Sequence, residues 1–216
     1  MKMTGKDENN MKVKEVLDCF FELSSLTKIP RTGWILAGVT DPESVSDHCY
    51  ETALFAYILS KYIDQKFDMK KVLLMSLFHE VGEARLTDLP RRSKDYIGNA
   101  KRQAEREVAK DVLANIGDEI MELLQELHNL SSPEARLVEA AEELQIIFKA
   151  MVYAKENRGD MSEYLLDAED YNPQGFEFVR QIASLIKEKL QKYLNNKIYW
   201  EVGYKYPRKR KKNDVF

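Results

Sequence analysis

Apolar side chains recur along this chain with the spacing of helices. From Val13 to Tyr193 they return every three or four positions, which places them on one face of each successive helix. No segment alternates apolar and polar β-forming residues for long enough to build a half-buried strand. The 216 residues are enough to bury one sizeable core. We therefore predict an all-α fold, a single helical bundle.

Helix boundaries follow from capping residues and helix breakers. Ser44 with Asp47 three positions later indicates a capping box, Asp68 is a second N-cap, and Ser132 before Pro133 is a third. The predicted helices span 13–24, 44–62, 68–83, 93–116, 118–129, 133–152 and 173–193, with an irregular segment at 33–42. The 68–83 helix is apolar on all sides in its middle, which is typical of a central, surrounded helix.

The two ends of the chain differ from its middle. Residues 1–10 are polar and are expected to form a flexible N-terminus, and residues 11–199 form the helical domain. Residues 200–216 carry a basic cluster at 208–212, and we expect a disordered tail there. The cluster has a second interpretation, which is contact with nucleic acid or anionic lipid.

Charge and hydropathy exclude several classes of partner. The chain has 33 Lys and Arg against 36 Asp and Glu, so its charge of -3 favours neither nucleic acid nor a membrane surface. The longest strongly apolar run, 72–78, is far shorter than the roughly 20 residues of a membrane span, and no signal stretch follows the first lysines. Two cysteines make no disulfide framework. We expect a cytoplasmic protein with no membrane and no nucleic-acid partner.

The side chains best suited to metal binding or catalysis are histidines and glutamates on separate predicted helices. His48 lies in one apolar stripe, and His79 closes the most apolar helix, followed at once by Glu80. Glu83 lies four positions after His79 and is predicted to share its helix face. Glu142 lies in a further apolar stretch. Imidazoles with carboxylates bind divalent metals of the Zn, Mn, Fe, Co or Mg class. The alternative is a set of buried histidine–glutamate hydrogen bonds.

The chain also carries several short motifs in a fixed order. They are PRTGW at 30–34, ESVSDH at 43–48, LFHEVGEARLTDLP at 77–90 and LVEAAEELQIIFKA at 137–150. Together they resemble the HD-domain phosphohydrolases, and in particular the branch that contains the 5′-deoxynucleotidases. The resemblance runs from about residue 12 to at least 195. It implies an HD-domain helical fold, one divalent metal ion per subunit (Mn, Co, Fe, Zn or Mg) and a homodimer.

The resemblance implies a role for each residue that matches the family motifs. The metal ligands correspond to His48, His79, Glu80 and Glu142. The catalytic residues correspond to Glu83 and Asp88, and the substrate-binding residues to Arg31 and Trp34. The last two have second interpretations, Arg31 as a surface charge beside a turn and Trp34 as ordinary core packing.

Two of the implied metal ligands depart from the family pattern. Glu80 and Glu142 stand where the family has aspartates, so each arm is longer by one methylene. A displacement of about 1 Å at an active site can cost about 100-fold in rate. Because Glu83, Asp88 and the substrate-binding residues remain, we interpret the change as a compensated metal site. The alternative is a site that has drifted out of use.

The activity implied by the resemblance is that of a metal-dependent phosphomonoesterase, which hydrolyses (deoxy)nucleoside 5′-monophosphates to nucleoside and phosphate. Two alternatives stay open. One is a phosphodiesterase of the same fold that acts on another phosphate ester, against which the PRTGW and GEAR motifs argue. The other is a degenerate HD-domain module that binds a nucleotide or a protein partner without turnover.

Overall fold

The structure is a computed structural model that describes residues 5–195, so the basic tail predicted at 200–216 lies outside the described residues. Over the described range the chain forms helices and no strand, with one isolated bridge between Pro30 and Ser44. The α-helices are α1 (Gly5–Ser24), α2 (Thr32–Leu36), α3 (Val45–Leu59), α4 (Met69–Phe78), α5 (Glu83–Leu86), α6 (Lys94–Ile97), α7 (Asn99–Leu113), α8 (Glu119–His128), α9 (Pro133–Lys155), α10 (Ser162–Asp170) and α11 (Glu177–Asn195). The all-α prediction is confirmed.

The predicted N-caps open three of these helices. Ser44 Oγ accepts a hydrogen bond from the Asp47 amide at 3.1 Å, while the Asp47 carboxylate accepts from the Ser44 amide at 2.8 Å, which completes a capping box. The Asp68 carboxylate accepts from the first amides of α4. Ser132 accepts from the Ala135 amide at the start of α9. The caps fix where α3, α4 and α9 begin, and these helices carry the candidate site.

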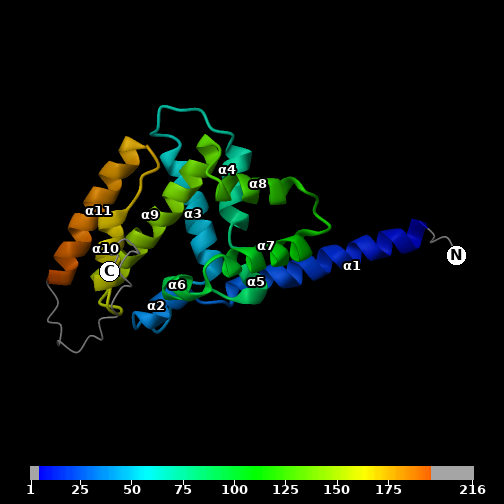
Figure 1. The fold of residues 1–216 in the computed structure, drawn as a ribbon, viewed down its shortest axis with the longest axis horizontal. Coiled ribbons are helices and arrows are strands. Elements are labelled where there is room, and N and C mark those ends of the chain that lie inside the picture. The colour runs from blue at the N-terminus through cyan, green and yellow to red at the C-terminus, as the bar shows by residue number, and fades with distance from the viewer. Residues whose placement is uncertain (1–4, 196–216) are drawn as a thin grey trace, which may run out of the picture.

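The central helix of the fold is α9. It lies between α3 and α4 on one side and α11 on the other (Figure 1). Many of its apolar residues lie in the largest buried cluster, among them Leu137, Val138, Ala140, Ala141, Leu144 and Ile147. The helix predicted at 68–83 was expected to be the surrounded one. That expectation is wrong, because Leu77 in α4 is 47% exposed.

The helix predicted through Glu83 ends earlier. α4 ends at Phe78 and α5 begins at Glu83. Between them the amide of Val81 donates to the Phe78 carbonyl at 3.0 Å, and that of Glu83 donates to the Glu80 carbonyl at 2.9 Å. These bonds span three residues, so the chain turns more tightly than an α-helix. The prediction that His79 and Glu83 share a face of one α-helix is therefore wrong.

Close backbone packing accompanies this tight turn. A Cβ atom placed on Gly82 would lie 2.7 Å from both Cα and Cβ of Glu105 in α7. Only a residue without a side chain permits that approach. Gly82 thus lets α7 lie directly against the segment that carries the histidine and the glutamates.

Other helix boundaries also differ from those predicted. The helix expected at 93–116 divides at Gly98, whose positive φ of 57° separates α6 from α7. The last helix begins at Glu177, after a turn in which Gly175 has a φ of 89°. α2 and α10 form where no helix was expected, because each is too short to show a clear period. α1 begins at Gly5, ahead of the apolar pattern.

No helix in the described part of the chain combines the length and the apolar character needed to cross a bilayer.

Candidate metal centre and active site

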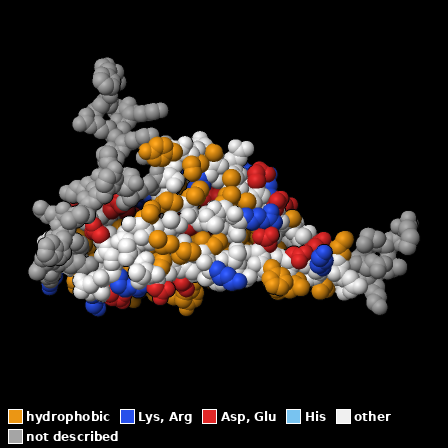
Figure 2. Space-filling view, turned by 90° about the horizontal axis from the view of Figure 1, so that it is seen from below, with side chains coloured by type: hydrophobic (Ala, Val, Ile, Leu, Met, Phe, Trp, Pro, Cys, Tyr) orange, Lys and Arg blue, Asp and Glu red, His pale blue; other side chains and the backbone are white. Residues whose placement is uncertain are grey.

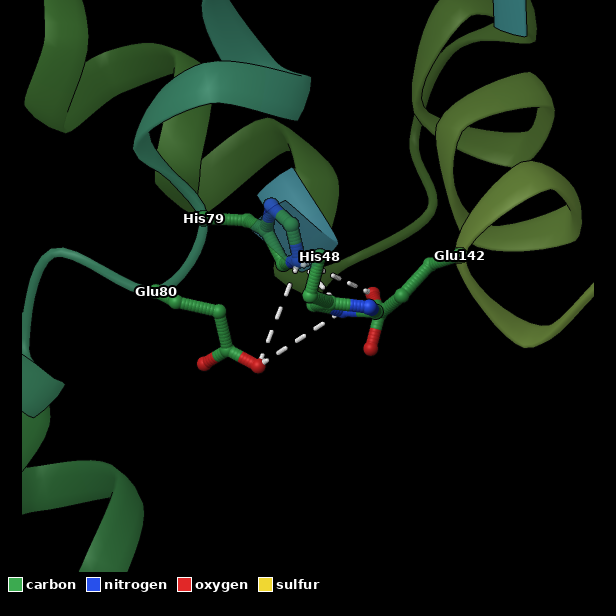
Figure 3. Close-up of side chains that lie close together, drawn as sticks. All are labelled: His48, His79, Glu80 and Glu142. Carbon is green, nitrogen blue, oxygen red and sulfur yellow. Dashed lines mark hydrogen bonds and ion pairs between the residues drawn. The ribbon is translucent and has the colours of Figure 1, made fainter. Parts of the chain in front are cut away.

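Four side chains from three parts of the fold converge on one point (Figure 3). His48 lies in α3, His79 and Glu80 directly follow α4, and Glu142 lies in α9. Since α3 and α4 both pack against α9, the core itself brings these residues together. They are the four residues that sequence analysis predicted as metal ligands.

The ligand atoms of this cluster lie close to one another. His48 Nε2 and His79 Nε2 are 3.2 Å apart. Glu80 Oε1 lies 4.0 Å from each of these two nitrogens, and Glu142 Oε2 lies 3.9 Å from His79 Nε2. Ligand atoms about 2.0–2.2 Å from one ion are roughly 3 to 3.5 Å apart, so the cluster would contract only slightly around a metal.

Hydrogen bonds on the far side of each ring direct both Nε2 atoms inward. His79 Nδ1 donates to the Ser76 carbonyl at 2.8 Å, and His48 Nδ1 lies 2.7 Å from Gln145 Oε1. Metal-binding histidines are typically held in this way by their second nitrogen. Two nitrogens and two carboxylates form a donor set of the kind that binds Zn, Mn, Fe or Co. The residues present therefore fit a divalent ion.

Burial and neighbouring charges separate the pKa values of the carboxylates. Burial disfavours the charge on Glu80, but His79, Arg31 and His48 outweigh it and lower the pKa of Glu80 to about 2. Burial raises the pKa of Glu142 to about 7, against the opposing effect of His79. Glu80 is thus fully charged at neutral pH, whereas Glu142 titrates near neutral pH. A bound cation would favour the charged form of both.

The pKa values of the two histidines are shifted in opposite directions. Burial, with Arg31 and His79 nearby, lowers the pKa of His48 well below its usual value. Burial opposes charge on His79 as well, but Cys49 and the two carboxylates outweigh it and raise the pKa of His79 well above the usual range. In the metal-free cluster the neutral form is thus favoured at His48 and the charged form at His79.

Glu83 lies beside the metal cluster at the start of α5 and is 1% exposed. Lys101 Nζ from α7 lies 3.3 Å from its Oε1, while Oε2 has no hydrogen-bond partner among the described residues. Burial raises the pKa of Glu83 to about 9, and the charges of Glu80 and Asp88 add to the effect. Lys101 does not reverse this, because it lies closer, at 2.8 Å, to Glu105. Glu83 is therefore a carboxylic acid at neutral pH.

Arg31 connects the metal cluster to Asp88. Its Nη1 donates to Glu80 Oε1 at 3.0 Å and to Asp88 Oδ1 at 3.2 Å. Asp88 is held in turn by Thr32, whose amide donates to its carboxylate and whose hydroxyl donates to its carbonyl. The side chain of Arg31 is 14% exposed, so it is no freely solvated surface charge. The structure brings Arg31, Glu80, Glu83 and Asp88 together.

Trp34 lies apart from this group in a buried aromatic cluster. It is 3% exposed, and its ring centroid lies 4.3 Å from that of Tyr164 and 5.3 Å from that of Tyr153. Its Nε1 donates to Glu43 Oε1 at 2.8 Å. This packing agrees with the core interpretation, while the expected contact with a nucleotide stays a prediction.

Sequence reasoning missed three polar residues around the site. They are Glu43, Lys101 and Gln145. Gln145 is fully buried one turn after Glu142, and a polar side chain inside the apolar stripe of α9 was the available signal. Lys101 gave no signal, because it lies in a helix rich in charged residues.

The fold and the metal cluster define a class. The HD domain family model matches residues 23–195, so the chain belongs to the HD domain family, and the resemblance seen in its motifs is confirmed at that level. A 5′-deoxynucleotidase from Dictyostelium discoideum is 32% identical over 147 residues, which are 63% of this chain and 77% of that protein. A 5′-deoxynucleotidase from Danio rerio is 29% identical over 154 residues, 68% of this chain and 74% of that protein.

A solved structure extends the match to most of the fold. A conserved hypothetical protein from Pyrococcus furiosus superposes with a TM-score of 0.68 at 32% identity. The superposition covers 81% of this chain and 99% of that protein. The curated relatives are therefore similar to this chain in sequence, and the solved structure shares its architecture.

Proposed function

We propose that this protein is a metal-dependent phosphomonoesterase that hydrolyses deoxynucleoside 5′-monophosphates to nucleoside and phosphate. One observation carries the proposal, which is that a buried, proton-bearing Glu83 and the guanidinium of Arg31 lie beside a cluster of two histidine nitrogens and two carboxylates. The names of the relatives supply the substrate class. Their activity is hydrolysis of a nucleotide, and the site has the groups that this chemistry needs.

His48, His79, Glu80 and Glu142 would hold one divalent ion, of which Mn, Co, Fe, Zn and Mg are the candidates. When bound, such an ion polarises a phosphate oxygen and lowers the pKa of a water molecule. The rest of the reaction falls to the chain's own side chains. Arg31 presents a planar fork that matches phosphate oxygens, and Asp88 holds that fork in place.

Glu83 is proposed as the general acid. Its proton is retained at neutral pH because the side chain is buried near Glu80 and Asp88. A retained proton can pass to the leaving 5′ oxygen as the phosphorus–oxygen bond breaks. We further propose that Trp34 shapes the end of the site that receives the sugar, where a change in the aromatic cluster would alter the preference for deoxyribose.

We also propose a cytoplasmic homodimer. Both cysteine thiols, Cys19 and Cys49, are free and buried, which agrees with a reducing compartment. α1 projects from the body of the fold (Figure 1), and Figure 2 shows hydrophobic side chains along that projection. Six of its large apolar residues are 48–68% exposed: Met11, Val13, Val16, Leu17, Phe20 and Phe21. An apolar face of this kind is typical of a protein interface. Phe20→Glu with Phe21→Glu should therefore convert a dimer to a monomer in light scattering.

The proposed activity is tested by phosphate release from metal-stripped protein. Deoxy- and ribonucleoside 5′-monophosphates would be supplied with Mn²⁺, Co²⁺, Mg²⁺, Zn²⁺ or Fe²⁺ in turn, and bis-p-nitrophenyl phosphate would report phosphodiesterase activity. We expect turnover with at least one metal and a preference for deoxynucleotides. Folded protein that turns over none of them would contradict the proposal and favour the binding module. Turnover of the diester alone would favour the phosphodiesterase.

A further inference from the structure

Gln145 is a fully buried polar residue that joins the metal cluster to a second group of charges. Its Oε1 lies 2.7 Å from His48 Nδ1. Its Nε2 lies 2.8 Å from Glu43 Oε2 and 2.9 Å from Glu51 Oε2. The residue lies in α9 three positions after Glu142, so both side chains lie on the face of α9 that is directed toward the cluster.

The two carboxylates determine which way the amide of Gln145 points. A carboxylate oxygen accepts hydrogen bonds, and only the NH₂ end of an amide can donate to it. Glu43 receives donors from three sides, since Trp34 Nε1 is 2.8 Å away and Lys149 Nζ 3.2 Å away in addition to the amide. Lys149 also lies 2.6 Å from Glu51. The NH₂ group therefore faces the carboxylates, and Oε1 faces His48.

This orientation determines the tautomer of His48. An amide oxygen only accepts hydrogen bonds, so the hydrogen between it and the ring belongs to His48 Nδ1. The lone pair of the neutral ring is then on Nε2, the atom that lies 3.2 Å from His79 Nε2 in the cluster. A neutral histidine without such a partner can carry its hydrogen on either nitrogen.

We propose that Gln145 is a positioning residue that holds His48 with its hydrogen on Nδ1 and its lone pair directed at the metal, and that Glu43, Glu51 and Lys149 act through it by fixing the orientation of the amide. The inference rests on the proposed metal site for its purpose, but the tautomer itself is a property of the metal-free chain. It can therefore be measured without metal or substrate.

The test is nitrogen NMR of full-length, metal-stripped protein labelled with ¹⁵N-histidine at pH 7.5. The chain has three histidines, so single substitutions assign the signals. We expect His48 in the Nδ1–H form in the unmodified protein, whereas the Nε2–H form there would overturn the proposal. This measurement needs no change at Gln145, so it decides the matter even if a Gln145 variant fails to fold.

Substitutions then test whether Gln145 is the cause. Gln145→Met keeps the length of the side chain and removes the acceptor, so His48 should shift toward Nε2–H and Zn²⁺ affinity should fall about 10- to 100-fold. Gln191→Met, at a half-buried position of α11, is the matched control and should change neither quantity. A folded Gln145→Met protein with an unchanged tautomer would overturn the proposal. Failure of nucleotide turnover with the expected tautomer would instead count against the proposed function alone.

Discussion

Arg31 and Glu80 are 49 positions apart in the chain, yet Arg31 Nη1 donates to Glu80 Oε1 at 3.0 Å. The same Glu80 oxygen lies 4.0 Å from the Nε2 atom of each histidine in the metal cluster. The guanidinium proposed to bind phosphate therefore contacts the same Glu80 oxygen that is proposed to bind the metal. Binding of a cation at that oxygen would weaken its hold on the guanidinium, which becomes available for a phosphate group.

Arg31→Ala should separate metal binding from substrate binding. Loss of charged hydrogen bonds to phosphate should raise KM and lower kcat/KM about 10- to 100-fold. Metal affinity should be kept or increased, since a positive charge beside Glu80 is removed. Steady-state kinetics and Zn²⁺ titration measure the two effects. Arg85→Ala is the control, because Arg85 pairs with Glu22 and Asp111. A parallel loss of metal affinity and turnover in Arg31→Ala would show that Arg31 only supports Glu80.

Glu83→Gln should abolish most turnover, by about 10²- to 10⁴-fold, because it removes the proton donor. The same change should stabilise the metal-free protein at neutral pH. The pKa of Glu83 is about 9 when folded against an ordinary value of 4.5, so the unfolded chain releases a proton that the folded chain retains. Stability of the parent protein therefore falls as pH rises from about 4.5 toward 9.

The measurement for this second effect is the Tm of both proteins in chelator between pH 5 and pH 8. We expect the advantage of Glu83→Gln to grow as the pH rises. Glu107→Gln, at a side chain that is 65% exposed on α7, is the control and should show no such trend. An advantage that is constant across the range would mean that the Glu83 carboxyl is ordinarily ionised in the fold.

Glu80→Asp and Glu142→Asp should each weaken metal binding in this chain. Their carboxylates reach to 4.0 and 3.9 Å from His79 Nε2 with the longer arm, and a shorter arm would withdraw the oxygen by about 1 Å. Metal affinity should fall about 10-fold or more, as measured with a competing chelator. Tighter binding and faster turnover in either variant would support the interpretation that the glutamates mark a site losing its function.

Trp34→Phe should lower stability and change substrate preference. The phenyl ring keeps much of the packing against Tyr164, but Glu43 Oε1 loses the donor at 2.8 Å. An unsatisfied buried acceptor costs about 1–3 kcal/mol, which thermal unfolding will detect. The ratio of deoxy- to ribonucleotide turnover should change with it. A lower Tm with an unchanged ratio would restrict Trp34 to the core.

The four residues of the metal cluster were predictable as a group because their motifs resemble those of the HD-domain family, and two of them are histidines, which are rare in this chain. The chain has three histidines, and His48 and His79 lie in apolar stripes where an imidazole needs a partner. The caps at Ser44, Asp68 and Ser132 were predictable for a similar reason, because capping depends on neighbours within four residues. Features that depend only on residues close in sequence can be predicted without knowing the tertiary structure.

The relation between His79 and Glu83 was not predictable in the same way. Helical spacing extends through both residues, but the chain turns more tightly between them, where Gly82 packs against Glu105 in a helix about twenty positions further on. Gln145 presents the converse case. Its polar side chain was visible in the sequence, but its partners Glu43 and Glu51 are brought to it only by the packing of α3 against α9.

Gly82 has no side chain, yet it influences how closely a cation approaches its neighbour Glu83. The contact of its Cα with the backbone of Glu105 determines how near α7 can come, and α7 carries Lys101, the cation beside Glu83. Any side chain at position 82 would move that cation away and leave Glu83 holding its proton more tightly. The distance between these two backbone segments is therefore one of the factors that adjust the acidity of the proposed proton donor.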